Sequence, residues 1–347
     1  MSRFVAPKML RGVFAGAGSD GLSQPVICDA ILQLTGKPSA SDVTVGYLGT
    51  ATYDLPMGRS RQTGILEERG CKIVDISVSD PAVQYDKTDL EQKLKSCDVV
   101  IVSGGNTLYA MDRWKLLGID GLLAEARDRG CVLAGGSAGA ICWFDGGHSD
   151  SADSDTFRGP MLAAAQAASA NKDESSAAPK DASEAKRWRY IRVSGLGFLP
   201  GLVCPHHDRI QSNGVLRATD FDGMMRRHPK ESALCIDHWA ALVVKGDEYE
   251  VITVPGKPGS VDGDGKSFST TQGPETSPGV WRKKVGSAKV DADPSTDDAQ
   301  ENLLLPIDAT VVPAKGLLGD ILAYAEGITI DPEEEACRKL NPATLCS

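Results

Sequence analysis

Ser137 lies at the centre of the segment Gly135-Gly136-Ser137-Ala138-Gly139-Ala140, directly after the apolar run 131–134. This order predicts a strand, a sharp turn and a helix, and the glycines let the chain turn without side-chain clashes. The helix that follows would direct free N–H groups and its positive dipole end at the reacting group. The spacing is that of a nucleophile elbow and predicts attack of a serine hydroxyl on an acyl group. The alternative is an ordinary glycine-rich turn, because short Gly/Ser/Ala strings are common.

A serine hydroxyl needs a base within hydrogen-bond reach. Among the five histidines, His206 and His207 follow an apolar run that ends at Pro205. Open α/β sheets place their sites at such strand ends. Adjacent residues on an extended segment point to opposite sides, so only one of the pair can face Ser137. His228 lies at a polar helix end and is predicted to be exposed.

The chemistry also needs donors for an oxyanion. The N–H of Ala138, the residue after the nucleophile, is one. The loop 103–107 follows an apolar strand and would open on the same sheet edge, so it could supply a second. In the plain structural interpretation, Asn106 or Thr107 only caps the next helix. A further glycine-rich segment, 16–21, matches a dinucleotide-binding pattern, but the expected acidic residue is not evident. We interpret it as a tight turn.

Strand and helix patterns alternate through the first part of the chain and must position these residues. Repeated β-α-β units with short connections predict an α/β fold, a doubly wound, mostly parallel sheet with helices on both faces. The expected strands are 12–15, 43–48, 71–76, 98–102 and 131–134, and the expected helices are 26–34, 63–68, 89–97, 108–116 and 121–129.

Composition divides the chain into three parts. Residues 1–255 form the expected catalytic domain, interrupted by a mobile, low-complexity insertion at 163–186. Residues 256–302 are rich in Gly, Pro, Ser, Thr and Asp and are predicted to be loop or disorder, with one strand near 280–281. Residues 303–347 are expected to dock on the core or to be partly disordered.

Charge and composition exclude several partners. The 347-residue chain has a net charge of −10 and no basic block with interleaved aromatics, so nucleic acid is not expected. No apolar run approaches the roughly 20 residues of a membrane helix, and we identify no signal peptide. Nine cysteines without a C-x-x-C pair indicate reduced, buried thiols in a cytoplasmic protein rather than a zinc site. No metal or cofactor is expected, and the oligomeric state stays open.

Three segments together resemble the peptidase E group of serine peptidases, which includes aspartyl dipeptidase and cyanophycinase. They are 102–108, 135–140 and 195–200, the last leading to Pro205-His206. The resemblance extends from about Gly12 to Ile252 and implies a fold similar to class I glutamine amidotransferases. Three motifs in one order are more specific than any one of them.

The resemblance implies that Ser137 is the nucleophile, that His206 is the base, and that Gly105 and Ala138 bind the oxyanion. The third member is implied to be Asp150, with Asp237 as the alternative. The family's glutamate position in the later strand-end motif is His238 here.

Substrate binding is assigned to Asn106 and to Arg217, which corresponds to the arginine that recognises an N-terminal aspartate; a helix-surface role is the alternative for Arg217. The sequence thus predicts a serine peptidase that hydrolyses short peptides through an acyl-enzyme, dipeptidase-like and with an N-terminal aspartyl preference as one option. The alternatives are an esterase or amidase, and a catalytically silent amidotransferase-like binding module.

Overall fold

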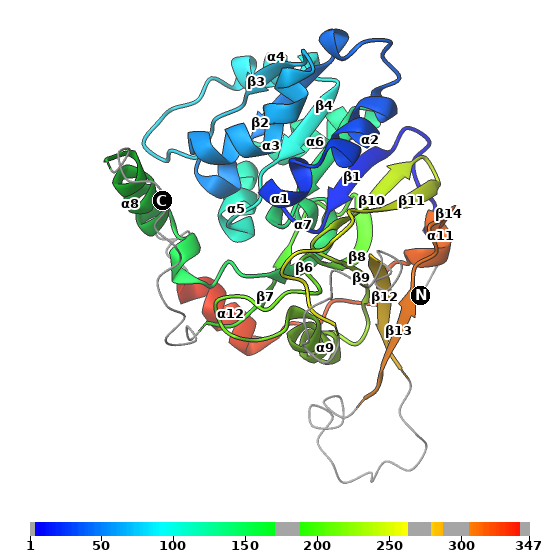
Figure 1. The fold of residues 1–347 in the computed structure, drawn as a ribbon. Helices are drawn as coiled ribbons and strands as arrows, with labels where there is room; N and C mark the ends of the chain where they lie inside the picture. The colour runs from blue at the N-terminus through cyan, green and yellow to red at the C-terminus, as the bar shows by residue number, and fades with distance from the viewer. Residues whose placement is uncertain (1–3, 171–187, 263–278, 287–304, 341–347) are drawn as a thin grey trace.

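Two mixed β-sheets form the body of the protein in a computed structural model, which describes residues 4–170, 188–262, 279–286 and 305–340. Figure 1 shows the first sheet in the upper part of the molecule and the second sheet below it. The α/β class predicted from the sequence is confirmed, but the expectation of one doubly wound sheet is wrong, because six of the strands after residue 143 build a second sheet.

The first sheet has eight strands in the order β14-β11-β10-β1-β5-β4-β2-β3. Its parallel part matches the apolar runs of the sequence, and β1 lies between β5, its parallel neighbour, and β10, its antiparallel neighbour. The bounds are β1 Arg11–Ala15, β2 Thr44–Leu48, β3 Lys72–Asp75, β4 Val99–Val102, β5 Val132–Gly136, β10 Ala240–Lys245, β11 Glu248–Thr253 and β14 Lys315–Leu317.

The second sheet has six strands in the order β13-β12-β9-β8-β6-β7. Strands β6, β8 and β9 are parallel, while β7, β12 and β13 add antiparallel edges. The bounds are β6 Phe144–Ser149, β7 Ile191–Ser194, β8 Leu199–Cys204, β9 Ser232–Ile236, β12 Val280–Val285 and β13 Ile307–Val311.

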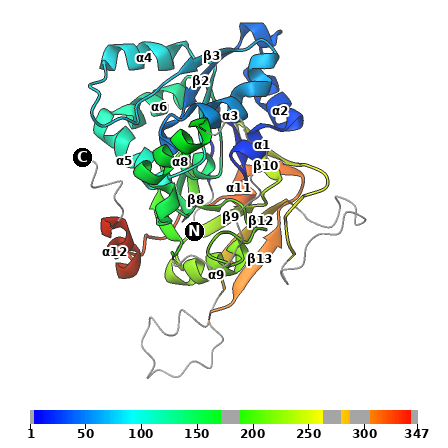
Figure 2. The same ribbon diagram turned by 60° about the vertical axis from the view of Figure 1, so that its left-hand side comes forward.

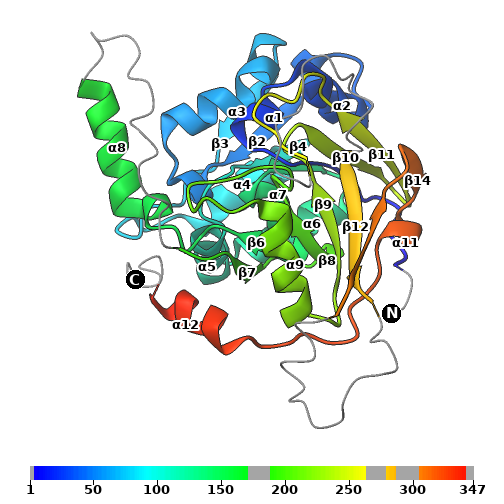
Figure 3. The same cartoon turned by 60° about the horizontal axis from the view of Figure 1, so that its bottom comes forward.

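Helices cover the sheets in layers, as alternating side chains along each strand require. On β1, Val13 packs in one core cluster with α2 and α3, while Phe14 packs in another with α4, α5 and α6 and with the inner face of the second sheet. The helix α9 covers the outer face of the second sheet (Figure 3). The bounds are α1 Ser19–Leu22, α2 Pro25–Thr35, α3 Pro56–Glu68, α4 Lys87–Ser96, α5 Thr107–Leu117, α6 Ile119–Asp128, α7 Ala138–Ile141, α8 Arg158–Ala170, α9 Arg217–Arg227, α11 Leu318–Ile321 and α12 Pro332–Leu340.

The two sheets share one core, and the short helix α7 contacts strands of both. The described strands after residue 255 belong to the same body, since β12, β13 and β14 are strands of the two sheets. The domain boundary predicted at 255 therefore divides a continuous structure. Within the predicted insertion, residues 163–170 continue α8, which lies in front of the body in Figure 2 and extends from it in Figure 3. The remainder of the insertion, 171–186, lies outside the described residues. No helix of the described ranges is long and apolar enough to cross a membrane.

Candidate active site

Three strand-end segments bury nearly everything they contain and leave one residue each partly exposed. From Cys131 to Phe144 the partly exposed residue is Ser137, and from Phe198 to Asp208 it is His206. From Val99 to Met111 it is Gly105. These are the nucleophile, the base and the loop glycine predicted from the sequence, and each follows a parallel strand of the body.

The turn at Ser137 has strained backbone geometry. Ser137 has φ 57° and ψ −121° between β5 and α7, a conformation that non-glycine residues rarely adopt. Its neighbours must be glycine, because a Cβ on Gly136 would lie 1.9 Å from the carbonyl oxygen of Ala17 and one on Gly139 would lie 2.2 Å from that of Val102. The strand-turn-helix geometry of the predicted elbow is therefore present.

The end of β1 holds the nucleophile and the base by consecutive carbonyl groups. The N–H of Ser137 donates to the carbonyl oxygen of Ala15 at 3.2 Å, and the N–H of His206 donates to that of Gly16 at 3.0 Å. His206 also adopts a positive φ of 50°. Two residues 69 positions apart in the sequence thus lie side by side on the same strand end.

The loop after β4 lies beside the elbow, as the parallel sheet predicted. A Cβ placed on Gly104 would lie 3.5 Å from the Cβ of Ser137. Gly105 has φ +116°, and a Cβ there would lie 2.2 Å from the carbonyl oxygen of Ala51, so only glycine fits. Ala138 is the first residue of α7, and its N–H therefore has no acceptor within the helix. Both oxyanion donors predicted from the sequence come from segments that adjoin Ser137.

The ring of His206 bonds to another histidine. His206 Nδ1 lies 2.7 Å from His238 Nδ1, and His238 Nε2 lies 3.1 Å from Asp20 Oδ2. Burial lowers the pKa of His206 well below its usual range, and the positive charges of Arg217 and Arg209 lower it further. Burial likewise lowers the pKa of His238 to about 4, although Asp20 acts in the opposite direction. Both rings are neutral near pH 7.

Neither carboxylate predicted as the third member bonds to His206. The nearest cationic atom to Asp150 is Arg217 Nη1, 4.0 Å from its Oδ2. Asp237 Oδ1 lies 3.3 Å from His207 Nδ1, and its Oδ2 lies 3.6 Å from Lys257 Nζ. His206 Nδ1 contacts His238 instead, so these contacts support neither carboxylate as the third member, and that assignment stays a prediction. His206 and His207 do have different partners, although they lie in a turn and not on the extended segment that the alternation argument assumed.

The side chains predicted to bind substrate, Asn106 and Arg217, form hydrogen bonds within the protein. Asn106 is fully buried, accepts from the N–H of Tyr109 as the N-cap of α5, and donates to Ser151 and Thr156. This is its plain structural role. Nothing in this arrangement presents its amide to a substrate.

Arg217 is 1% exposed, so the helix-surface alternative is wrong. Its guanidinium donates to Gln211 and to the carbonyl oxygen of His148, and it lies 4.7 Å from the centre of the Tyr190 ring. These contacts engage two of its nitrogens within the protein and do not support carboxylate binding, which stays a prediction. His228 is also buried, against Glu334, and not exposed as predicted.

The depressed pKa of His206 predicts activity in mild acid. A histidine with an ordinary pKa of about 6.5 would be some 90% protonated at pH 5.5 and lose about tenfold in rate. A base whose pKa lies well below that value stays neutral and competent, so kcat/KM at pH 5.5 should remain within about threefold of its value at pH 7.5.

The measurement is kcat/KM from pH 4.5 to 8 with an uncharged peptide substrate. Circular dichroism at each pH provides the control, because a buried neutral histidine destabilises the fold as the pH falls below its unfolded pKa. An acid limb centred near 6.5 with the fold intact would contradict the buried, neutral pair.

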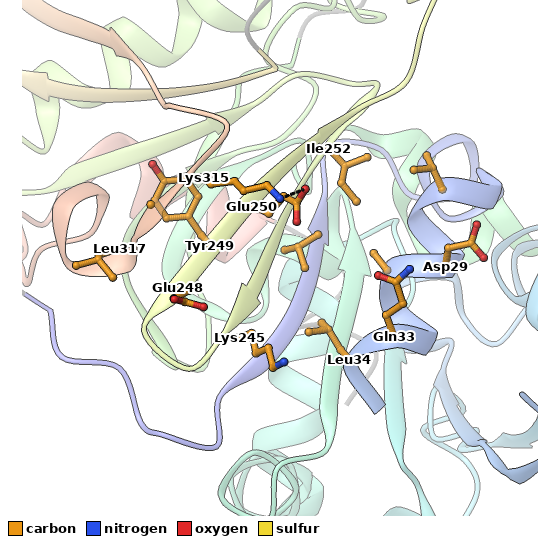
Figure 4. Close-up of a pocket in the computed structure, with 14 residues that line it drawn as sticks. Asp29, Gln33, Leu34, Lys245, Glu248, Tyr249, Glu250, Ile252, Lys315 and Leu317 are labelled. Atoms are coloured by element: carbon orange, nitrogen blue, oxygen red, sulfur yellow. Dashed lines mark ion pairs between the residues drawn. The ribbon is translucent and has the colours of Figure 1, made fainter. Parts of the chain in front are cut away.

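A cavity of about 830 Å³ lies elsewhere in the molecule. Figure 4 shows its lining side chains, which come from α2, β10, β11 and β14 and include Gln33, Tyr249 and Lys315. None of the residues considered above lines it. Among the described residues no group of three or more His, Cys, Asp or Glu side chains is arranged to hold a metal ion.

Comparison with known proteins identifies the site's family. The model of "Peptidase family S51" matches residues 15–252, which contain the elbow, the loop after β4 and both histidines. The chain belongs to peptidase family S51. It is therefore a serine-type peptidase, and peptides are its substrate class.

Relatives of this S51 peptidase include two curated proteins. A Trypanosoma brucei brucei protein named G2/mitotic-specific cyclin-1 is 30% identical over 269 residues, 73% of this chain and 78% of that protein. The uncharacterized peptidase YgaJ of Bacillus subtilis (strain 168) is 36% identical over 121 residues, 35% of this chain and 37% of that protein. The crystal structure of a peptidase from an acI-B1 Actinobacterium has a TM-score of 0.47 and 16% identity, and the match covers 71% of this chain and 88% of that one.

Sequence reasoning missed Asp20. It lies at the start of α1, in the glycine-rich segment 16–21 that we interpreted as a tight turn. The segment bends at Gly16 and Gly18, where the backbone passes close to Asp237 and Gly104, and its second half begins α1. The sequence did contain a signal for it: Asp20 follows β1, and β1 is the parallel neighbour of β5, the strand that leads to Ser137.

Proposed function

We propose that this S51 peptidase hydrolyses short peptides, with Ser137 as nucleophile, His206 as general base and acid, and the N–H groups of Gly105 and Ala138 as oxyanion donors. The observation that carries the proposal is the selective exposure of Ser137, His206 and Gly105 in three otherwise buried segments. A fold that merely needed tight turns would have no reason to expose these three residues and bury their neighbours.

The proposed reaction balances as an acyl transfer. Ser137 Oγ bonds to the scissile carbonyl carbon while its proton passes to His206, and the carbonyl oxygen becomes an oxyanion held by two N–H groups. Collapse breaks the C–N bond, and His206 returns the proton to the leaving amine. Water then repeats the sequence, with His206 as base, and releases the carboxylic acid and free Ser137.

Preference for an N-terminal aspartate is a finer possibility that the arrangement of Arg217 does not support. Its guanidinium is committed to Gln211, His148 and Tyr190. An acidic preference would therefore have to come from another cation. The net charge of −10 also disfavours the approach of acidic substrates.

A peptide library tests the proposal. Dipeptides and tripeptides that include Asp-X and X-Asp members should be cleaved, longer unfolded chains poorly or not at all, and matched esters should not be the better substrates. A fluorophosphonate probe should label wild-type protein and not Ser137→Ala. Absence of both labelling and cleavage would favour the silent binding module, and faster ester than peptide turnover would favour the esterase alternative.

A further inference from the structure

The glycine-rich turn after β1 carries a carboxylate that nothing above uses. Asp20 is half-exposed, and its Oδ2 lies 3.1 Å from Nε2 of the buried His238. The other nitrogen of His238 lies 2.7 Å from His206 Nδ1. We propose that Asp20 and His238 together position the base, as a two-residue relay in which His238 transmits the carboxylate's effect to His206. The inference rests on the proposed roles of Ser137 and His206.

Hydrogen-bond chemistry allows one assignment of protons along this chain. An ionised carboxylate can only accept, so His238 must carry its proton on Nε2. A neutral imidazole has one N–H, so His238 Nδ1 is then an acceptor, and His206 must donate from its own Nδ1. This leaves His206 Nε2 unprotonated. The carboxylate of Asp20 thereby fixes the tautomer of His206, although two hydrogen bonds separate the carboxylate from that ring.

The relay also accommodates the charge that forms during the reaction. When His206 Nε2 takes the proton of Ser137, its Nδ1 proton can move along the 2.7 Å contact to His238 Nδ1. His206 is then neutral again, and the positive charge lies on His238, bonded to Asp20. The reverse movement returns the proton for the leaving amine, so no proton is gained or lost.

The other charged groups around His238 do not stabilise a positive charge on its ring, so this stabilisation depends on Asp20. Arg209 opposes a positive charge on this ring. Asp208 accepts from the backbone N–H of His238, not from its ring, and the Asp237 carboxylate is bonded to His207 and Lys257. Among the contacts of the described residues, Asp20 is the carboxylate that reaches the ring. Asp20 also forms an ion pair with Arg61, 3.2 Å away. A substitution at Arg61 can therefore remove the ion pair without removing the contact between Asp20 and His238.

The test is a set of variants of the full chain assayed on a cleavable dipeptide. Asp20→Asn should lower kcat about 100-fold with little change in KM, the scale of a general-base contribution. The fall of kcat/KM at acid pH, its acid limb, should move to lower pH. The reason is that the positively charged form of the His206–His238 pair is less stable without the Asp20 carboxylate. Arg61→Met is the matched control: it removes the ion pair but keeps the carboxylate, so kcat and the acid limb should stay unchanged.

A double-mutant cycle makes the relay falsifiable. His238→Glu places a carboxylate directly against His206 and should raise the acid limb. Asp20→Asn should then cost little in that background, since its effect passes through the His238 ring. An equal loss in both backgrounds, or a wild-type kcat and acid limb for Asp20→Asn, would overturn the proposal.

A readout without turnover separates this proposal from the proposed function. Nitrogen-15 NMR of histidine-labelled protein should show His206 as the Nδ1–H tautomer and His238 as the Nε2–H tautomer. Those tautomers in a protein without Ser137-dependent hydrolysis would support the proton assignment and reject the peptidase roles. The opposite tautomers would overturn the relay even in an active enzyme.

Discussion

Ser137→Ala should abolish peptide hydrolysis and leave the fold intact. Loss of the nucleophile in a Ser-His catalytic unit costs on the order of 10⁶ in turnover, because the remaining groups have no acyl acceptor. The substitution removes one partly exposed hydroxyl from a turn whose backbone is held by its glycines and by Ala15. Stability should therefore change by no more than about 1 kcal/mol.

The measurement is kcat on the best dipeptide, with thermal unfolding followed in parallel. Ser212→Ala, an exposed serine on the loop after His206, is the matched control and should retain full activity. Residual turnover of more than a few per cent in Ser137→Ala, after contaminating peptidase is excluded by active-site labelling, would remove Ser137 from the nucleophile role.

His206→Ala and His207→Ala should differ by several orders of magnitude in kcat. His206 is the base of the proposed unit, so its loss should cost about as much as loss of the serine. His207 faces the other way: it is buried, and its ring bonds to Asp237. Its removal leaves a buried carboxylate short of a partner, which should lower the free energy of unfolding by about 1–3 kcal/mol.

Steady-state kinetics and denaturant unfolding of the two variants give opposite expected patterns. His206→Ala should unfold like the wild type and be inactive, whereas His207→Ala should be less stable and keep kcat within about tenfold. Equal losses of kcat in both, or the greater loss in His207→Ala, would reverse the assignment of the base.

The parallel half of the fold was predictable because buried parallel strands read as apolar runs between helical repeats. Strands β1 to β5 lie within a few residues of their predicted positions. The second sheet was predictable only in part. The apolar run before His206 is β8, and the strand expected near 280–281 is β12. By contrast, β6 is a polar, glycine-containing segment, Phe144–Ser149, without a clear period. Local pattern also carries no information about which sheet a strand joins, and β12 comes to β9 from 44 positions away.

The site also divides into residues that local sequence patterns predict and contacts that depend on residues far apart in the sequence. Ser137, Gly105 and the choice of His206 depend on local turns at strand ends, and the structure places those residues together. The partner of His206 depends on distant residues: Asp20 meets His238 across 218 positions. The burial of Arg217 was missed for a related reason, since it is decided by Tyr190 and His148 on other elements.

The position of β1 makes the support of the site depend on strands that lie far apart in the sequence. Ser137 and His206 both bond to carbonyl groups at its carboxyl end, and β1 itself is completed by β10, where Gly12 pairs with Val244. The ribosome makes β1 well before β10, because more than 200 residues separate the two strands. A nascent chain that has released the nucleophile and the base still lacks the strand that completes their support. Contacts of such sequence separation also form late in folding. The backbone support of Ser137 and His206 is thus complete only after β10 has joined the sheet.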